Sequence, residues 1–254
     1  MRRVIRCALM VGLLALAGCE PNSSGLTSKQ GDAILTELRE IKELLKDRGQ
    51  AARAPALQSA VPAQQQAASK VVVESAYSLG SPDAPVVLVE FVDLQCPFCR
   101  RFHLQTFDEI RDRYIKTGKV RYVVKDLPLP IHPLAMAAAV ATRCAGIVGK
   151  DEGYWKMVEA LFANGAMLSE AVIVSLSDDL GFDRKAFSDC RSDRNVARLI
   201  ENDAAEAKKL GITGTPTFVI AQAASKEVNG ERIIGAQPLA AFTTPIDELL
   251  KGSK

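Results

Sequence analysis

Residues 91–103 read FVDLQCPFCRRFH and continue a run of apolar residues that begins at Pro85. The apolar run predicts a strand buried on both faces, and a helix is expected after it. Cys96 and Cys99 would lie on the first turn of that helix, close enough to form a disulfide and able to open it without unfolding the chain. The stretch therefore predicts a strand and a helix with a redox-capable cysteine pair at their junction.

The two thiols are expected to differ in reactivity. Cys96 starts the helix, where unpaired N–H groups and the positive end of the helix dipole favour a thiolate, so it is the predicted nucleophile. Cys99 lies one turn further, on the apolar side, and is the predicted resolving thiol. Two alternatives are a purely structural disulfide and a weak metal clamp with His103 as a third ligand. His132 is the only other histidine, and there is no second Cys-x-x-Cys pair.

The beginning of the chain has the residue order of an export signal. Three arginines stand among the first six residues, and an apolar stretch from Cys7 to Ala17 follows them. Charged residues followed by a short apolar core are typical of a signal peptide. The apolar stretch is too short to remain in a bilayer as a spanning helix.

The end of this signal resembles the lipobox of bacterial lipoproteins, in the sequence Leu16-Ala17-Gly18-Cys19. The resemblance implies removal of the signal peptide, residues 1–18, and lipidation of Cys19. The mature protein would be tethered to the cell envelope by acyl chains alone, facing the periplasm. Glu20 in place of aspartate favours the outer membrane. An ordinary secretory signal that is cut elsewhere is the alternative.

Export decides how the cysteines are counted, because exported compartments are oxidising. Of the six cysteines, Cys7 would leave with the signal and Cys19 would carry lipid. The remaining cysteines permit two disulfides, and they are Cys96, Cys99, Cys144 and Cys190. With 254 residues, 48% of them hydrophobic, and a net charge of +2, the chain can bury one ordinary core. Its charge gives no reason to expect a nucleic-acid partner.

The region between the signal and the domain contains one predicted helix. Residues 19–31 are a predicted lipidated tether, and residues 49–69, rich in Ala, Gln and Pro, are a predicted flexible linker. Between them, residues 32–48 form a predicted amphipathic helix whose heptad seam consists of Ile34, Leu38, Ile41 and Leu45. Two heptads are marginal alone. A short oligomerising coiled coil, a helix docked on the core and a spacer are the alternatives.

Residues 70–252 have the pattern of a compact α/β domain. The predicted elements are, in order, strands at 71–73 and 85–92, a helix at 96–114, a strand at 120–127, a helical block at about 133–210, strands at 217–220 and 231–234, and a helix at 239–250. The predicted helix caps in the block are Asp151, Ser169 and Asp183, and the predicted helix ends are Gly165, Gly181 and Gly211. Asn229-Gly230 is a predicted turn. This order predicts a mixed sheet with a helical subdomain inserted in its middle.

A second motif precedes the strand at 217–220. In Gly211-Ile212-Thr213-Gly214-Thr215-Pro216-Thr217-Phe218 a proline stands where a strand begins, and a cis peptide bond before Pro216 would explain its placement. This motif and Cys96-Pro97-Phe98-Cys99 together resemble those of the thioredoxin superfamily, and the inserted helices narrow the resemblance to DsbA-like thiol:disulfide oxidoreductases. The resemblance covers residues 70–252, including Gly235-Ala236-Gln237-Pro238. It implies a thioredoxin fold in which Thr215 and Pro216 bind substrate beside Pro97 and Phe98.

Glu90 interrupts the otherwise apolar run 86–92, so a buried carboxylate is expected in the central strand. An ionised and unpaired carboxylate would be costly there. The resemblance implies that Glu90 shuttles protons to and from the cysteines. The alternative is a salt bridge with Arg121 or Lys125 on the neighbouring strand. Asp93, in the following loop, is a predicted turn former.

Cys144 and Cys190 fall in the helical block, where they would be either inert core thiols or partners. An oxidising compartment favours their pairing, and the resemblance implies a second, structural disulfide in the insert. Such a bond would stabilise the fold by roughly 4 kcal/mol on the chain-entropy model. Three neighbouring apolar residues of the block are predicted to be ordinary core, namely Trp155, Leu161 and Phe162.

The dipeptide between the cysteines tunes the direction of redox work. Pro97-Phe98 differs from the Pro-His pair of well-known oxidases, whose imidazole could stabilise the thiolate, and from the Gly-Pro pair of thioredoxins. An intermediate redox potential is therefore expected. Thr215 matches the residue usual in dimeric disulfide isomerases. We therefore predict an envelope enzyme that forms or isomerises disulfides in exported proteins, with oxidation favoured.

Two other functions are alternatives: a copper metallochaperone that uses Cys96 and Cys99, and a reductase for cytochrome maturation. The sequence has no nucleotide or flavin motif, so no cofactor is predicted. Electrons would then pass through partner thiols or a membrane redox partner. Self-association through residues 32–48 would favour isomerase or reductase work.

Overall fold

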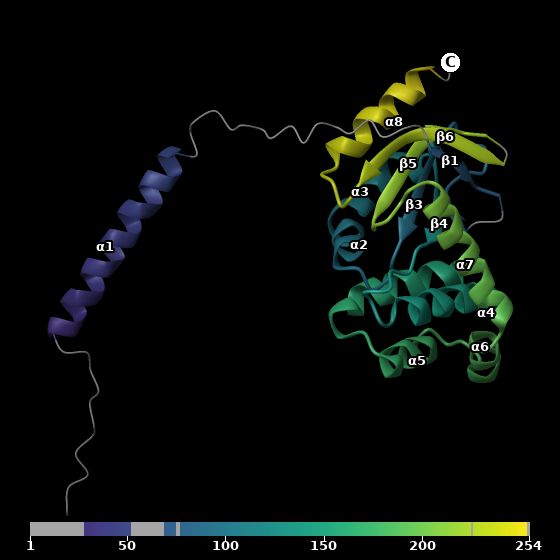
Figure 1. Cartoon of the computed structure of the whole chain (residues 1–254), viewed down its shortest axis with the longest axis horizontal. Helices are drawn as coiled ribbons and strands as arrows, with labels where there is room; N and C mark the ends of the chain where they lie inside the picture. The colour runs from purple at the N-terminus through teal and green to yellow at the C-terminus, as the bar shows by residue number, and fades with distance from the viewer. Residues whose placement is uncertain (1–27, 52–68, 75–76, 225, 253–254) are drawn as a thin grey trace, which may run out of the picture. The chain divides into compact units, whose positions relative to one another are not determined.

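The computed structural model describes residues 28–51, 69–74, 77–224 and 226–252, and Figure 1 shows them as coloured ribbon. The chain divides into two units, residues 1–63 and 64–254. The predicted signal peptide, the lipidation site Cys19 and most of the predicted tether and linker lie outside the described residues. None of the helices that the structure describes is long and apolar enough to cross a bilayer.

The first unit holds the helix α1 (Ser28–Ala51), which is longer than the predicted 32–48. Its apolar seam faces solvent, because Ile34 is 44% exposed, Leu38 55% and Ile41 52%. The side chain of Leu45 lies outside the described residues. The described part of α1 thus carries an apolar stripe on its surface.

The second unit is built on a six-stranded mixed sheet of order β1-β6-β5-β3-β4-β2. The strands are β1 (Ser69–Val72), β2 (Ser78–Leu79), β3 (Val86–Val92), β4 (Val120–Asp126), β5 (Thr217–Gln222) and β6 (Glu227–Ile234). β3 and β4 are parallel, and the other pairs are antiparallel. Every residue of β3 is buried, as the apolar run predicts. The sheet and its inserted helices confirm the predicted fold class.

The two faces of the sheet pack against different helices. Val86, Leu88 and Tyr122 belong to a core that also includes residues of the helices after β3, of α4 (Ala135–Asn164) and of α8 (Ala240–Gly252). Residues one position away, such as Val87 and Phe91, pack on the opposite face with residues at the end of α7 (Arg194–Lys209). Because side chains alternate along a strand, an offset of one residue decides which core a side chain enters.

The helix after β3 differs from a regular α-helix. It runs as α2 (Pro97–Phe102), the π-helical η1 (His103–Phe107), α3 (Asp108–Ile110) and the π-helical η2 (Arg111–Ile115). Each π segment adds a residue to a turn, so buried side chains recur five positions apart, as in Phe102 and Phe107. Between them, Thr106 is only half-buried. π segments are frequent at functional sites.

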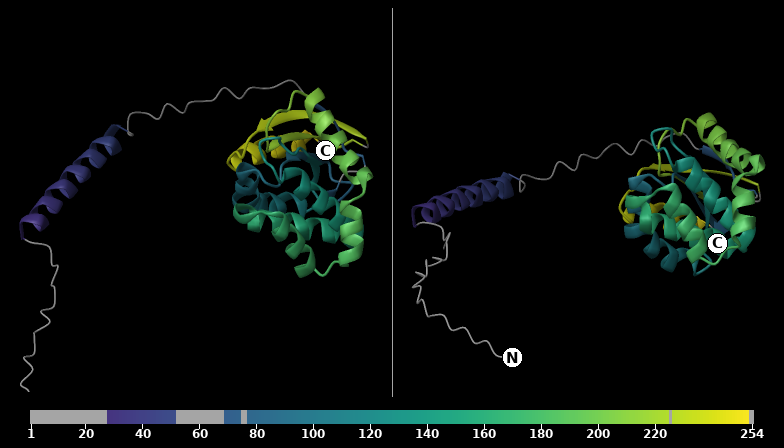
Figure 2. Two further views of the ribbon diagram at one scale, coloured as in Figure 1. Left: turned by 60° about the horizontal axis from the view of Figure 1, so that its bottom comes forward. Right: turned by 90° about the horizontal axis from the view of Figure 1, so that it is seen from below.

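The helical insert lies at one end of the domain, opposite α8 (Figures 1 and 2). It comprises α4, the short η3 (Gly165–Met167), α5 (Glu170–Asp179) and α6 (Arg184–Arg191), and it continues into α7. Ser169 and Asp183 accept hydrogen bonds from Val172 N and Ala186 N, and so cap α5 and α6 as predicted. α4 breaks direction at Lys150 (φ 57°, ψ −163°), one residue before the predicted cap Asp151. Gly181 and Gly211 end helices with positive φ.

Two devices hold the insert together and to the sheet. Cys144 and Cys190 form a disulfide between α4 and α6, with Cα atoms 5.7 Å apart. Arg143 on α4 donates to Asp126 at the end of β4 and to Asp203 on α7, at 2.6 Å each. Since buried charges need partners, this cluster fixes the insert on the sheet.

The predicted turn at Asn229-Gly230 is wrong. Both residues lie inside β6, where they pair with Lys70 and Ser69 of β1. A Cβ atom on Gly230 would lie 2.0 Å from the carbonyl oxygen of Ile220. Glycine is therefore present because the neighbouring backbone approaches closely, which is its other common role in a strand.

Candidate active site

Cys96 lies at the N-cap of α2, and Pro97 is the first helical residue. The Cys96 N–H donates to Asp93 O at 3.0 Å, and the Cys96 carbonyl accepts from Arg100 N at 3.0 Å. Cys96 and Cys99 are both free thiols, 3% and 0% exposed. The sequence -Cys-Pro-Phe-Cys- thus places both sulfur atoms at the carboxyl end of β3.

The environment separates the two thiols electrostatically. A hydrogen bond from the Cys99 thiol, assisted by Thr215 and by backbone groups of Cys99 and Phe98, lowers the pKa of Cys96 to about 5. Burial raises the pKa of Cys99 well above its usual range, and the bond to Cys96 and the charge of Glu90 add to this effect. Cys96 is the thiolate at neutral pH and Cys99 keeps its proton. The largest cause of the lowered Cys96 pKa is therefore the hydrogen bond from the Cys99 thiol, whereas the sequence indicated the helix dipole.

The loop before β5 closes over Cys96. The Thr215–Pro216 peptide bond is cis, as the sequence predicts. The Thr215 carbonyl oxygen lies 3.4 Å from Cys96 Sγ, and the Thr215 hydroxyl is buried without a hydrogen-bond partner among the described residues. The two motifs identified in the sequence, 119 positions apart, therefore meet at one sulfur atom.

Asp93 forms the predicted turn and also makes longer-range contacts. Its Oδ1 accepts from Gln95 N at 2.8 Å. Its Oδ2 accepts from Leu129 N at 2.9 Å and lies 2.7 Å from Nδ1 of His132. A buried carboxylate with these partners fixes the loop before Cys96 against residues 127–134.

Glu90 is fully buried, as predicted, on the sheet face that carries Cys99. Its Oε2 accepts a hydrogen bond from the Tyr122 hydroxyl and lies 3.0 Å from Nε2 of His103. Burial, together with the Glu90 charge, raises the pKa of Tyr122 well above its usual range, so Tyr122 stays protonated. Glu90 Oε1 has no hydrogen-bond partner among the described residues.

The alternative prediction, a salt bridge between Glu90 and Arg121 or Lys125, is wrong. In the parallel register, Arg121 pairs with Val87 and Lys125 with Phe91, so both lie on the opposite face from Glu90. Arg121 donates to Val73 O, and Lys125 forms ion pairs with acidic residues of α7. His103, the third ligand of the alternative metal clamp, has its Nε2 3.0 Å from Glu90 Oε2. In the described part of the chain, no three side chains of metal-binding type gather.

Pro97 and Phe98 are exposed beside Cys96, and the Phe98 ring is 52% exposed with the Arg101 guanidinium 5.2 Å from its centre. Leu161 and Phe162 are buried core, as predicted. Trp155 is partly buried, and with Phe162 it lines a pocket behind the active site.

The family described as Thioredoxin matches residues 72–248. The chain belongs to the thioredoxin family. Among solved structures it is similar to Wolbachia pipientis α-DsbA1, with 29% identity and a TM-score of 0.63 over 71% of this chain and 93% of that one. It is also similar to Pseudomonas aeruginosa DsbA2, with 26% identity and a TM-score of 0.57 over 71% of this chain and 96% of that one. BdbD from Bacillus subtilis shares the fold at 21% identity, with a TM-score of 0.64 over 73% and 98%.

Within the family, the chain is therefore DsbA-like. The chain is also similar to two curated proteins that are named Na⁺/H⁺ antiporters, NhaA 1 of Salinispora arenicola and NhaA 3 of Salinispora tropica. They are 31% and 32% identical over 69% and 66% of this chain. This chain matches only 25% and 24% of their length. The antiporter name describes those longer proteins.

The site of this DsbA-like chain includes residues that sequence reasoning missed. The sequence indicates His103 only as an alternative metal ligand, and it assigns no role to Tyr122. The sequence carried only part of the signal. His103 lies one turn after Cys99, but that Tyr122 shares the face of Glu90 follows from the register of β3 and β4, and the direction of His103 depends on the π segment. The contacts of Asp93 with His132 join residues 39 positions apart and had no local signal.

Proposed function

We propose that this protein exchanges disulfides with exported proteins in the bacterial cell envelope, forming or isomerising their bonds. The observation that carries the proposal is the opposite shift of the two thiol pKa values, with Cys96 at about 5 and Cys99 raised. A thiolate pKa between those of a strong oxidase, about 3.5, and thioredoxin, about 7, supports an intermediate potential. A stabilised thiolate favours the reduced form and so makes the disulfide an oxidant.

The reaction follows from this asymmetry. A substrate thiolate attacks Cys96 Sγ, the Cys96–Cys99 bond breaks, and Cys99 takes a proton as it leaves. A second substrate thiolate then attacks the mixed disulfide and releases Cys96 as a thiolate, so two electrons pass from substrate to enzyme. In the opposite direction, Cys99 loses its proton and attacks the mixed disulfide on Cys96.

Glu90 is the group that we assign to this proton. The Cys99 thiol and the Glu90 carboxylate are both fully buried, and the Glu90 charge acts on the pKa of Cys99. The unpartnered Oε1 is the oxygen available to receive the proton. A positioned acid or base of this kind accelerates proton transfer by about 10²- to 10⁴-fold.

Substrate binding is proposed for the exposed residues around Cys96. Phe98 offers an apolar ring beside the nucleophile, and the backbone at Thr215 and Pro216 lies against its sulfur. An extended substrate segment would pair with this backbone by β-augmentation. Thr215 in this position supports isomerase work as well as oxidation.

Self-association through α1 is a further part of the proposal. Ile34, Leu38 and Ile41 recur at heptad spacing and are exposed, and a second copy of the same helix would cover them. Sedimentation of the purified protein should show an oligomer that dissociates in the variant Leu38→Asp. A monomeric wild type would remove this part and leave the redox proposal intact.

The proposed location rests on the sequence. A signal ending before Cys19, lipidation of that residue and an outer-membrane anchor remain proposals. Cleavage before Cys19 with lipid attached would be visible as the mass of the N-terminal peptide of protein isolated from membranes.

The test of the redox proposal is oxidative refolding of a reduced disulfide protein with the oxidised enzyme in catalytic amounts. Acceleration above the glutathione background is expected, together with correction of scrambled disulfides. No acceleration, combined with retention of one copper ion per chain, would favour the metallochaperone instead. Activity only toward reduction of disulfides would favour the reductase.

A further inference from the structure

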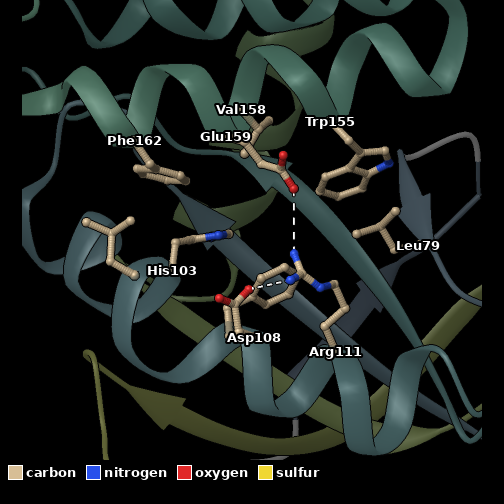
Figure 3. A pocket seen from close by; sticks show the side chains of 10 residues that line it. Leu79, His103, Asp108, Arg111, Trp155, Val158, Glu159 and Phe162 are labelled. Atoms are coloured by element: carbon tan, nitrogen blue, oxygen red, sulfur yellow. Dashed lines mark ion pairs between the residues drawn. The ribbon is translucent and has the colours of Figure 1, made fainter.

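A pocket of about 330 Å³ lies behind the active site, between the helix after β3 and α4. Figure 3 shows His103 pointing into it beneath Phe162, with Asp108 and Arg111 on the lower wall and Glu159 and Trp155 on the upper one. The volume is far above the 10–15 Å³ that one water requires. The disulfide reaction described above makes no use of this pocket.

Proton transfer to Glu90 creates a problem of access. Glu90 and Cys99 are both 0% exposed, so a proton moved between them has no direct route to solvent. Of the two side chains that contact Glu90 Oε2, Tyr122 is fully buried and keeps its proton. The other, His103, is 8% exposed at its side chain and lines the pocket.

We infer that His103 carries protons between Glu90 and solvent in the pocket, acting through Glu90 and not on the sulfur atoms. The inference rests on the proton role proposed for Glu90. When Cys99 attacks the mixed disulfide, its proton passes to Glu90 and from there to an Nε2 of His103 that carries no proton, while Nδ1 releases its proton to the pocket. When Cys99 leaves as a thiolate, the same steps run in reverse. Imidazole gains and loses protons near neutral pH, which suits this exchange.

The surroundings of His103 fix the ring for such a relay. The ring stacks on Phe162 at 4.2 Å between centroids, with an interplanar angle of 22°, and it lies 4.9 Å from Phe107. The Tyr122 hydroxyl is 3.4 Å from Nε2. The ring therefore keeps Nε2 directed at Glu90.

The charged groups around the ring come from every element that packs on it. Glu90 and Tyr122 face it from the sheet. At the pocket, Arg111 pairs with Asp108 at 2.6 Å and with Glu159 at 3.6 Å. Arg111 partly neutralises these two carboxylates, and Glu159→Gln tests whether the charge that remains at the pocket affects the rate.

The experiment measures resolution of the mixed disulfide on Cys96 in the reduced full-length protein after it is mixed with oxidised glutathione. Acid quenching and mass spectrometry follow the rate from pH 5 to 9. We expect Glu90→Gln, His103→Ala and His103→Gln to slow resolution by about 10-fold or more, with a changed pH profile. Leu104→Ala, which alters a pocket residue that is 51% exposed, should resolve at the wild-type rate.

Added imidazole separates a relay from a structural role. In His103→Ala, imidazole entering through the pocket should restore at least half of the lost rate, and more so as its neutral fraction rises with pH. In His103→Gln, where the side chain fills the site and can hydrogen-bond to Glu90 but cannot carry a proton, no rescue is expected. If His103→Ala does not fold, the altered pH profile of His103→Gln carries the test.

Each other result has a distinct meaning. Slow Glu90→Gln with wild-type rates in both His103 variants would overturn the relay and leave the role of Glu90. A slow His103→Ala without rescue would mean that His103 only positions Glu90, which also overturns the relay. Wild-type rates in Glu90→Gln would remove both roles, and absence of any mixed disulfide in the wild type would remove the proposed function itself.

Discussion

The molecule contains two cysteine pairs with opposite behaviour. Cys144 and Cys190 are 46 positions apart, bonded, and joined between two helices of the insert. Cys96 and Cys99 are three positions apart and free, at the first turn of a helix and under a cis-proline loop. At the Cys96–Cys99 pair, the charge of the buried Glu90 helps to raise the pKa of Cys99. The surroundings, and not the residue type, therefore separate the reactive pair from the bonded one.

The largest expected difference between the pairs is in activity. Cys96→Ser removes the nucleophile and should reduce disulfide exchange by more than about 10³-fold. The double variant Cys144→Ser with Cys190→Ser should keep exchange within about twofold. Both are measured by oxidative refolding of a reduced substrate. Loss of exchange in the double variant while it remains folded would break the division of roles.

The Cys144–Cys190 pair should instead affect stability. Removing the Cys144–Cys190 bond should lower the free energy of unfolding by about 2–4 kcal/mol, because the unfolded chain regains the freedom of a long loop. Removing the Cys96–Cys99 bond by reduction should have a much smaller effect, since its loop is short. Denaturant unfolding of the double variant and of the wild type in both redox states provides the comparison. Equal changes would contradict it.

Glu90, the acid beside the reactive pair, is expected to affect the rate of disulfide exchange and not the stability of the fold. Glu90→Gln keeps an acceptor for the Tyr122 hydroxyl but cannot take a proton, so exchange should slow by about 10- to 100-fold while the melting temperature falls little. Single-turnover kinetics and thermal unfolding measure the two effects. Unchanged kinetics across pH 5 to 9 would exclude the proton role of Glu90.

A smaller effect should follow from the dipeptide between the reactive cysteines. Phe98→His places a cationic ring near Cys96, lowers the pKa of its thiol further and makes the disulfide more oxidising, by about 30 mV for a tenfold change in equilibrium. Equilibration with glutathione gives the potential. Phe98→Leu is the matched control, and it should leave the potential close to that of the wild type.

Much of the fold followed from local patterns. The apolar run of β3 predicted full burial, and Ser169 and Asp183 were identified as caps from their positions before helical segments. Other features left no local trace. β2 has two residues, too few for an alternation. Gly230 supports close backbone approach in a strand, and this requirement is visible only when Ile220 is in place.

The candidate active site, like the fold, was predictable only in part. The cysteines, Glu90 and the loop at Pro216 each lie within a recognisable motif. The His103–Glu90–Tyr122 network depends on the parallel register of β3 and β4 and on the π segment that begins at His103. A π segment shifts the helical period by one residue without a change in composition, so sequence periodicity cannot fix the direction of His103.

The measurement that most directly tests the asymmetry of the reactive pair is alkylation of the reduced protein as a function of pH, with each cysteine followed by mass. Because the Cys96 pKa is lowered to about 5, its reaction should be nearly constant between pH 6 and 8 and should fall as the pH drops through 5. Cys99 should stay unreactive throughout this range, since burial raises its pKa. A Cys96 reaction that rises steadily up to pH 9, or equal reactivity of both thiols, would contradict the account.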